Sequence, residues 1–485
     1  MNPAPPVFFD LHVHSTLKPS LLSAVDSPWQ DYDEATPTER VRRTPRLTQS
    51  DFTKLLRSGT RVVCLALHPL ERYLVSAFTT RPVMYALIFR MRLEKVRQIL
   101  QRNPFTILQQ EYNLLLAYRR QPDGPGEVIL VRRPEDIDEA IANPHKIATI
   151  LSLEGAHALG FEYRDYTFPA IRGFSYDEFF PLTRDGIRAR MEWAAARGIH
   201  MITLVHMVYN HLATPAKAVE FQGLATVLPN PYRSLRSVGR FRGLSSYGAF
   251  FVEEAYRRGI LIDVKHCDHI ARREVYEIAQ DYGMPVIASH VAVSGLGLTQ
   301  RKFRKDLRRH RLNSERFNPW DINLHNEDLL AIARSGGLIG IILDERVCAG
   351  EKLLQAVRNG EVPPLEPFFQ QIRHIYLTLV EGGVPPRQAF STLCLGSDFD
   401  GFIDPIDAVP TVLEYPTVLW PALLHFFEEE YTLFADTHWT PVELAEGLAA
   451  RNGISFWKRF LRQKGERAGA AALAPDAASE ALSGY

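Results

Sequence analysis

Eight short apolar runs, each ending in a polar or ionisable residue, constrain the fold of this chain more than any other feature of its sequence. The runs are 7–14, 61–68, 147–154, 200–206, 260–266, 285–290, 337–344 and 392–398. Apolar runs of this length suit strands that are buried on both faces, as in a parallel sheet covered by helices. We therefore interpret them as eight parallel strands.

Amphipathic segments separate many of these runs. Segments 246–258 and 326–335 have the apolar spacing of helices, and Gly259 and Gly336 follow them where a helix-terminating glycine belongs. Met84–Tyr118 also has a helical pattern. A strand followed by a helix, repeated eight times, predicts an α/β fold of the (β/α)8 TIM-barrel type. A doubly wound open sheet is the alternative, because periodicity alone does not count strands.

The bulk composition bounds the class of protein. The 485 residues include 56 Lys and Arg against 56 Asp and Glu, and a neutral balance gives no general attraction to nucleic acid or to an anionic membrane. The four cysteines form no CxxC pair, which indicates reduced thiols. We see no signal peptide and no apolar stretch long enough to span a bilayer, so we expect a cytoplasmic protein.

The runs are unevenly spaced along the chain. We expect one barrel domain over residues 1–464, with insertions at 15–59, 69–145 and 291–321, and a flexible tail over 465–485. Loops that follow barrel strands lie at the face where active sites form. We therefore expect the insertions to act as lids, substrate walls or oligomer contacts.

Ionisable residues stand where the predicted strands end. They are His12, His14, Glu154, His206, His266, His290 and Asp398. His12 and His14 are two residues apart on one strand, so both side chains point to the same face and can bind one ion. A lone His-x-His pair is more often explained by packing. Here the metal-binding interpretation is favoured because the pair ends a strand, as the other ionisable residues do. Imidazole and carboxylate ligands together favour Zn²⁺.

The remaining strand ends supply a second set of ligands. Glu154 is either a solvated carboxylate at a loop start or a carboxylate that bridges two cations, one on each oxygen. His266 and His290 end adjacent strands and can hold the second ion as neutral imidazoles. We expect two divalent ions, with zinc as the metal.

Three further residues are candidates for catalysis and substrate binding. Asp398 begins an Asp-Phe-Asp-Gly stretch and is placed to take a proton from an activated water and pass it on. His206 is either a hydrogen-bonded core histidine or a donor to the oxyanion of a tetrahedral intermediate. Asn210 either binds substrate or caps a helix.

With these residues in place, the chain resembles the membrane dipeptidase (renal dipeptidase) family of zinc peptidases in the amidohydrolase superfamily. The matching segments are 152–155, 203–206 with Asn210, 243–248, 259–266, 285–290, 396–401 and 451–453 with Phe456. The resemblance covers most of residues 146–460. It implies a barrel with a binuclear zinc site that hydrolyses dipeptides, in which Glu154 bridges the ions, Asp398 handles protons and His206 binds substrate.

Three departures from the family pattern stand out. The family usually has His-x-Asp at the end of the first strand, where this chain has His12-Val-His14, which removes one negative charge. The family's carboxylate-binding arginine after strand six has no counterpart in 319–324, although basic runs at 301–305 and 308–311 offer replacements. The insertions are also large.

Two other functions stay open. Asp10–Ser15 also resembles the opening of the polymerase-and-histidinol-phosphatase (PHP) phosphoesterases. A barrel that binds metal but has no dipeptidase activity is the second alternative. We expect a small dipeptide-like substrate, no nucleic-acid or membrane partner, and we leave open a homodimer.

Overall fold

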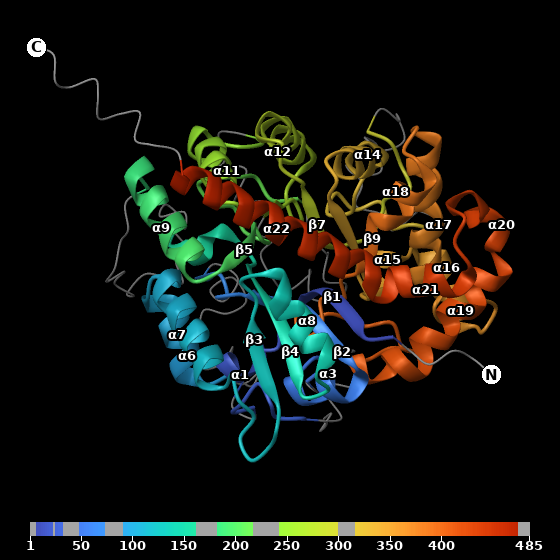
Figure 1. Cartoon of the computed structure of the whole chain (residues 1–485), viewed down its shortest axis with the longest axis horizontal. Coiled ribbons are helices and arrows are strands. Elements are labelled where there is room, and N and C mark those ends of the chain that lie inside the picture. The colour runs from blue at the N-terminus through green and yellow to red at the C-terminus, as the bar shows by residue number, and fades with distance from the viewer. Residues whose placement is uncertain are drawn as a thin grey trace, which may run out of the picture.

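A computed structural model describes residues 6–22, 25–32, 48–72, 91–161, 182–216, 242–298 and 316–473, with side chains up to 467. Its main feature is a parallel barrel of eight strands, drawn in Figure 1. These strands are β1 (Phe8–Val13), β2 (Thr60–Leu67), β4 (Lys146–Leu153), β5 (Ile199–Thr203), β6 (Leu261–Asp263), β7 (Ile287–Val291), β8 (Leu338–Ile341) and β9 (Leu393–Leu395), and they neighbour one another in this order.

The two ends of this path meet, which excludes the open sheet. A bridge pairs Val13 with Phe399, just beyond β9. The Asp398 N–H donates to the His12 carbonyl at 3.0 Å, and the His14 N–H donates to the Phe399 carbonyl at 2.9 Å. The predicted (β/α)8 fold is therefore confirmed, with a nearly closed barrel.

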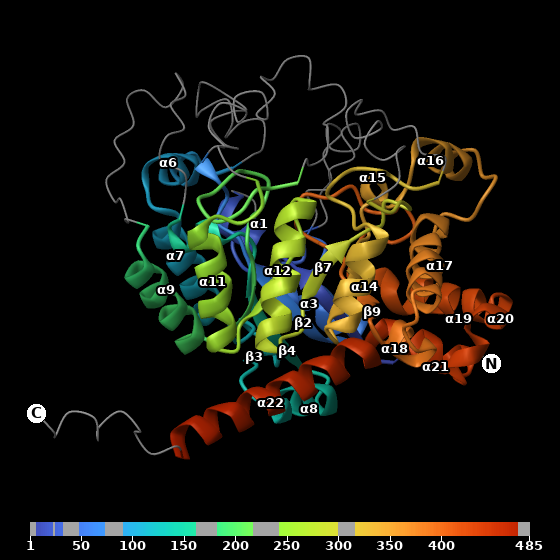
Figure 2. The same ribbon diagram turned by 90° about the horizontal axis from the view of Figure 1, so that it is seen from above.

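Helices surround the strands and cover one end of the barrel. The α-helices are α1 (Leu17–Leu21), α3 (Phe52–Ser58), α6 (Leu93–Gln101), α7 (Pro104–Ala117), α8 (Pro134–Ala142), α9 (Arg184–Ala196), α11 (Ser246–Arg257), α12 (His269–Tyr282), α14 (Asn326–Arg334), α15 (Glu345–Cys348), α16 (Glu351–Arg358), α17 (Glu366–Glu381), α18 (Pro386–Ser391), α19 (Trp420–Glu429), α20 (Tyr431–Phe434), α21 (Pro441–Glu446) and α22 (Asn452–Leu473). Short 3-10 or π turns are η1 (Ala156–Leu159), η3 (Val412–Glu414), η4 (Tyr415–Leu419), η5 (Ala435–Thr437) and η6 (Gly447–Arg451). In Figure 2, α22 crosses the side of the molecule opposite α6, α15 and α16.

Close packing of α22 against β1 depends on a glycine. A Cβ added to Gly453 would lie 2.2 Å from ring carbons of Phe9, so a larger residue would push the helix off the strand. Both predicted helices 246–258 and 326–335 are present, and Gly259 and Gly336 follow them with φ of +63° and +74°. That left-handed conformation is open to glycine without strain.

Segment 69–145 contains elements that the apolar pattern did not single out. It holds α6, α7 and α8, together with a ninth strand, β3 (Glu127–Leu130), which pairs with β4 outside the barrel path. Only Val128 of β3 is fully buried, so the strand lacks the apolar run that marks the others. The helical pattern at 84–118 is split between α6 and α7, because Pro104 cannot continue α6; residues 84–90 lie outside the described part.

Several expectations concern residues that the structure does not describe. The basic runs at 301–305 and 308–311 lie outside the described ranges, as does most of 291–321. Helix α22 continues to Leu473, into the expected tail at 465–485. None of the described helices has the length and apolar character to cross a bilayer.

Candidate metal centre

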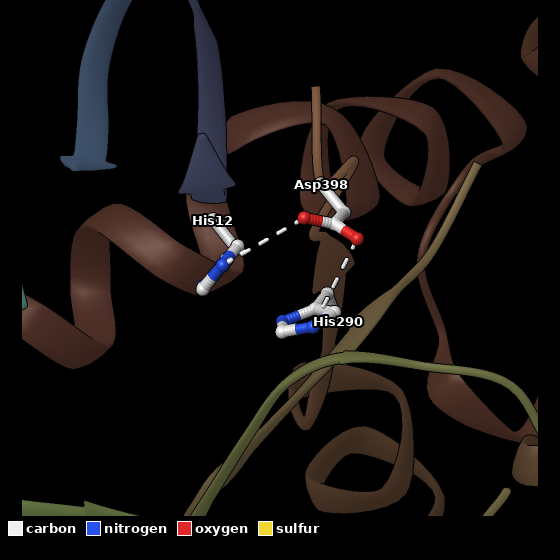
Figure 3. Close-up of side chains that lie close together, drawn as sticks. All are labelled: His12, His290 and Asp398. Atoms are coloured by element: carbon white, nitrogen blue, oxygen red, sulfur yellow. Dashed lines mark ion pairs between the residues drawn. The ribbon is translucent and has the colours of Figure 1, made fainter. Parts of the chain in front are cut away.

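Six of the seven predicted strand-end residues contact one another through their side chains in a single buried cluster. The seventh, His206, borders this cluster. The residues come from the carboxyl ends of five strands that are far apart in sequence. Figure 3 shows three of them, with His12 and His290 each facing a different oxygen of Asp398. The parallel barrel creates this cluster, because it brings every strand end to one face.

Glu154 lies between two pairs of histidines. Its Oε2 is 3.3 Å from His14 Nε2. Its Oε1 is 3.0 Å from His266 Nε2 and 3.4 Å from His290 Nε2. His12 Nε2 is 3.8 Å from the same Oε1. Oε2 is therefore nearest to His14 and Oε1 nearest to His266 and His290, so the carboxylate has one oxygen for each side of the cluster, as a bridging ligand needs.

Asp398 faces both histidine sets from β9. Its Oδ1 is 3.4 Å from His14 Nε2, and its Oδ2 is 4.0 Å from His290 Nε2. Asp398 and His266 both have φ of 65°, which non-glycine residues rarely adopt. Strained backbone of this kind costs about 1–3 kcal/mol and clusters at functional sites.

Hydrogen bonds fix the tautomer of His290. The Ser289 hydroxyl donates its one hydrogen to Asp263 Oδ2 at 2.6 Å, so it can only accept from His290 Nδ1, 2.8 Å away. The proton of the neutral ring is therefore on Nδ1, and Nε2 presents a lone pair to Glu154 and His266. A buried hydrogen-bond partner of this type is typical of metal-binding histidines.

A second buried carboxylate supports the opposite side of the cluster. Asp10 Oδ1 accepts from the N–H groups of His12 and Ser397, and its Oδ2 accepts from the Tyr415 hydroxyl at 2.7 Å. It therefore ties the His12 strand to the segment that carries Asp398. Burial raises the pKa of Asp10, although these hydrogen bonds oppose the rise.

The donor set fits two divalent cations. Two groups of three ligand atoms meet the spacing for an ion, namely His12, His14 and Glu154, and Glu154, His266 and His290. Ligands of a tetrahedral zinc ion are about 3.3 Å apart, and the Nε2 atoms of His266 and His290 are 3.3 Å apart. A third group shares His12 and His290 with these two and adds Asp398.

The charged groups of the cluster shift one another's pKa values. Burial disfavours a charged His14 ring, but hydrogen bonds to Asp398 and Glu154 outweigh it and raise the pKa of His14 to about 10. Burial also raises the pKa of Asp398 to about 6, against the opposing effect of its hydrogen bond to His14. A carboxyl group that titrates near neutral pH is suited to proton transfer.

His206 contacts a carboxylate that sequence reasoning missed. Its Nδ1 is 2.8 Å from Glu71 Oε1, and its Nε2 is turned toward the cluster, 3.9 Å from Glu154 Oε1. Burial lowers the pKa of His206, but the charge of Glu71 and then that of Glu154 raise it to about 9. Glu71 was not predicted because it lies in a loop, three residues after His68 ends an apolar run.

Asn210 holds the loop that follows β5. Its side-chain amide donates to the Leu204 carbonyl, and its Oδ1 accepts from the N–H groups of Leu212 and Ala213. These bonds resemble a cap rather than a substrate contact, and the role of Asn210 in substrate binding stays a prediction.

Lys265 is a second charged residue that the sequence pattern did not reveal. Its side chain is buried next to His266, and burial lowers its pKa to about 8, although Asp398 and Glu154 oppose the shift. It adds a positive charge beside a cluster in which position 14 is a histidine, where the family resemblance leads us to expect an aspartate.

Comparisons with known proteins point to one protein family. The sequence profile of the membrane dipeptidase family (peptidase family M19) matches residues 188–430, which include His206, His266, His290 and Asp398. A Schizosaccharomyces pombe protein named as an uncharacterized dipeptidase is 27% identical over 173 residues. That match covers 35% of this chain and 31% of the yeast protein, so the chain spans about a third of the relative.

Solved structures share the fold over nearly the whole chain. The dipeptidase AC, a metallopeptidase, is 15% identical with a TM-score of 0.54, and covers 95% of this chain and 99% of its own. A Rhodobacter sphaeroides metallopeptidase, solved with a phosphinate mimic of L-Ala-D-Ala, has 15% identity and a TM-score of 0.52, and covers 95% and 100%. Because the family profile spans half of the sequence and its matched region carries four of the clustered side chains, this chain belongs to the membrane dipeptidase family, peptidase family M19.

Proposed function

We propose that this protein is a binuclear zinc dipeptidase that hydrolyses the amide bond of dipeptide-like substrates. In this proposal His12, His14 and Glu154 hold one ion, and Glu154, His266 and His290 hold the other. The observation that carries the proposal is the position of Glu154, with Oε2 3.3 Å from His14 and Oε1 3.0 Å and 3.4 Å from His266 and His290. His12, His14 and Glu154 lie outside the region that the family profile matches, so their assignment as ion ligands rests on the geometry of the site.

Bound divalent ions would polarise the scissile carbonyl and lower the pKa of water at the site. In this proposal Asp398 carries the proton. Its carboxylate accepts a proton from the attacking water and delivers it to the leaving nitrogen as the C–N bond breaks. The water oxygen ends in the new carboxylate, and the second product is the free amine.

His206 is placed to stabilise the transition state. Its Nδ1 contacts Glu71, so its Nε2 points toward the bridging Glu154. An N–H on Nε2 donates to the oxyanion that forms as the carbonyl is attacked. One donor of this kind contributes about 10²- to 10³-fold to kcat in hydrolases.

A substrate panel tests the proposal. The zinc-loaded protein is assayed with L,L- and L,D-dipeptides and, in parallel, with phosphate monoesters, and its zinc content is measured on the same sample. Dipeptide hydrolysis with at least two zinc ions per chain supports the proposal. Phosphatase activity without peptidase activity would point to the phosphoesterase reading, and bound zinc without any turnover would point to a non-catalytic barrel.

A further inference from the structure

A second group of potential ligands borders the binuclear site, and none of its members is among the proposed ligands of the two ions. His68 follows β2, Glu71 lies three residues later, and His206 follows β5. One ligand atom from each lies within 4.8 Å of the others. His68 and Glu71 are each only 3% exposed, so water does not readily satisfy their polar atoms.

Glu71 has one satisfied oxygen and one unsatisfied oxygen. Its Oε1 accepts from His206 Nδ1 at 2.8 Å and from the Met207 N–H at 3.2 Å. Its Oε2 is buried and has no hydrogen-bond partner among the described residues. Buried carboxylate oxygens are normally paired, so this atom indicates a ligand.

His68 points a lone pair at that oxygen. Its Nδ1 lies 2.9 Å from the main-chain carbonyl of Glu154, which can only accept, so Nδ1 carries the proton. Nε2 is then unprotonated and lies 3.8 Å from Glu71 Oε2. Two acceptors at this separation repel each other unless a positive charge lies between them.

From this geometry we propose that His68, Glu71 and His206 bind a third divalent cation beside the binuclear centre. The separations of 2.8 Å and 3.8 Å bracket the spacing of about 3.3 Å between ligands of a tetrahedral zinc ion. The bond from His68 Nδ1 to a main-chain carbonyl is the outer contact that metal-binding histidines usually make. A hydrogen-bonded Glu71–His206 pair alone would leave the buried Glu71 Oε2 unexplained.

The third cation would replace the Nδ1 proton that His206 donates to Glu71 and would release that proton to solvent. With Nδ1 bound to the ion, the only ring proton of a neutral His206 is on Nε2, where the proposed mechanism needs a donor. This consequence rests on the proposed function, whereas the cation site itself does not.

Native mass spectrometry of the zinc-loaded full chain tests this site directly. We expect three zinc ions per wild-type chain and two in Glu71→Gln. His68→Asn is a second variant, since its amide can still donate to the Glu154 carbonyl but lacks Nε2; it should also bind two. His157→Gln is the matched control, because His157 is a neighbouring buried histidine that contacts the Pro69 carbonyl and belongs to no ligand group, and it should bind three.

Anomalous diffraction at the zinc edge locates the ions. A third peak among His68, Glu71 and His206 supports the inference. Two ions in the wild type, or three in both Glu71→Gln and His68→Asn, overturn it. Two ions in the wild type would overturn the third site but leave the dipeptidase proposal intact. No ions in the wild type would contradict both the third site and the dipeptidase proposal.

Discussion

The Nε2 atoms of His12 and His14 lie 3.0 Å apart at the buried end of β1. The two rings meet nearly edge to face, with centroids 4.8 Å apart, so both nitrogens point into the same space. A cation held by these nitrogens and Glu154, as proposed, would account for this approach, because both rings would then offer lone pairs. The pair is also where the chain departs from the family pattern, since His14 replaces an aspartate.

The first prediction concerns that replacement. His14→Asp keeps a zinc ligand and should still bind both ions of the binuclear site, with dipeptide turnover within about tenfold of the wild type. His14→Ala removes the ligand and should weaken zinc binding by more than about tenfold, since even outer contacts of a ligand are worth that much. Zinc titration against a chromogenic chelator measures both variants. Equal zinc affinity in His14→Ala and wild type would remove His14 from the site.

The hydroxyl of Ser289 should control zinc affinity without touching the ion. Ser289→Ala frees the Nδ1 of His290, so the ring can adopt the wrong tautomer, and we expect zinc affinity to fall about 10- to 100-fold. Ser152→Ala is the matched control, because the buried Ser152 hydroxyl bonds only the Leu65 carbonyl. Chelator competition gives both affinities, and an equal loss in the two variants would contradict the role of Ser289.

Replacing the proton carrier should separate catalysis from metal binding. Asp398→Asn keeps the size of the side chain but cannot accept the proton, so kcat should fall about 10²- to 10⁴-fold. The zinc content of the variant should equal that of the wild type, because Asp398 is outside both proposed ion sites. Steady-state kinetics with elemental analysis measures the two quantities. Unchanged turnover would show that another group carries the proton.

A buried histidine remote from the metal centre should make folding stability depend on pH. His200 Nε2 donates to the Val131 carbonyl at 2.9 Å, and Lys464 Nζ lies 3.3 Å from Nδ1. Burial, reinforced by the charge of Lys464, lowers the pKa of His200 to about 3. Between pH 3 and the ordinary value near 6.5, the unfolded chain therefore binds a proton that the folded chain does not, so stability falls as the pH decreases through this window.

His200→Gln tests this dependence, because glutamine does not titrate. Below pH 6.5, the free energy of unfolding of the wild type should fall relative to that of the variant by up to about 1.4 kcal/mol for each pH unit. Urea unfolding at several pH values measures the difference, and the comparison cancels effects that both proteins share. A difference that stays constant from pH 7 to pH 5 would mean that His200 is not held neutral.

The sequence was sufficient for the barrel and for the clustering of the candidate ligands, because both depend on where buried strands end. Val7–His14 and Ile260–His266 show this, since their apolar residues fix the strands and their last residues reach the open face. β3 was missed because its four residues are mostly half-buried and carry no such run.

The supporting contacts were harder to predict for a different reason. Asp10 and Asp263 lie inside apolar strands, where a lone carboxylate gives no hint of the hydrogen bonds that hold it. His68 ends an apolar run and could have been chosen, but Glu71 depends on the path of a loop. The contacts of Glu71 with His206 join residues 135 positions apart, which periodicity does not reveal.

Metal removal and restoration test the central claim most directly. Dipeptide turnover and thermal unfolding are measured on the purified chain after chelation and again after addition of zinc. We predict that the stripped protein has no dipeptidase activity and a lower Tm, and that zinc restores both with at least two ions per chain. Binding at 100 times the dissociation constant stabilises a fold by about 2.7 kcal/mol. Full turnover after chelation, or a purified chain that takes up no divalent ion, would contradict a binuclear metal dipeptidase.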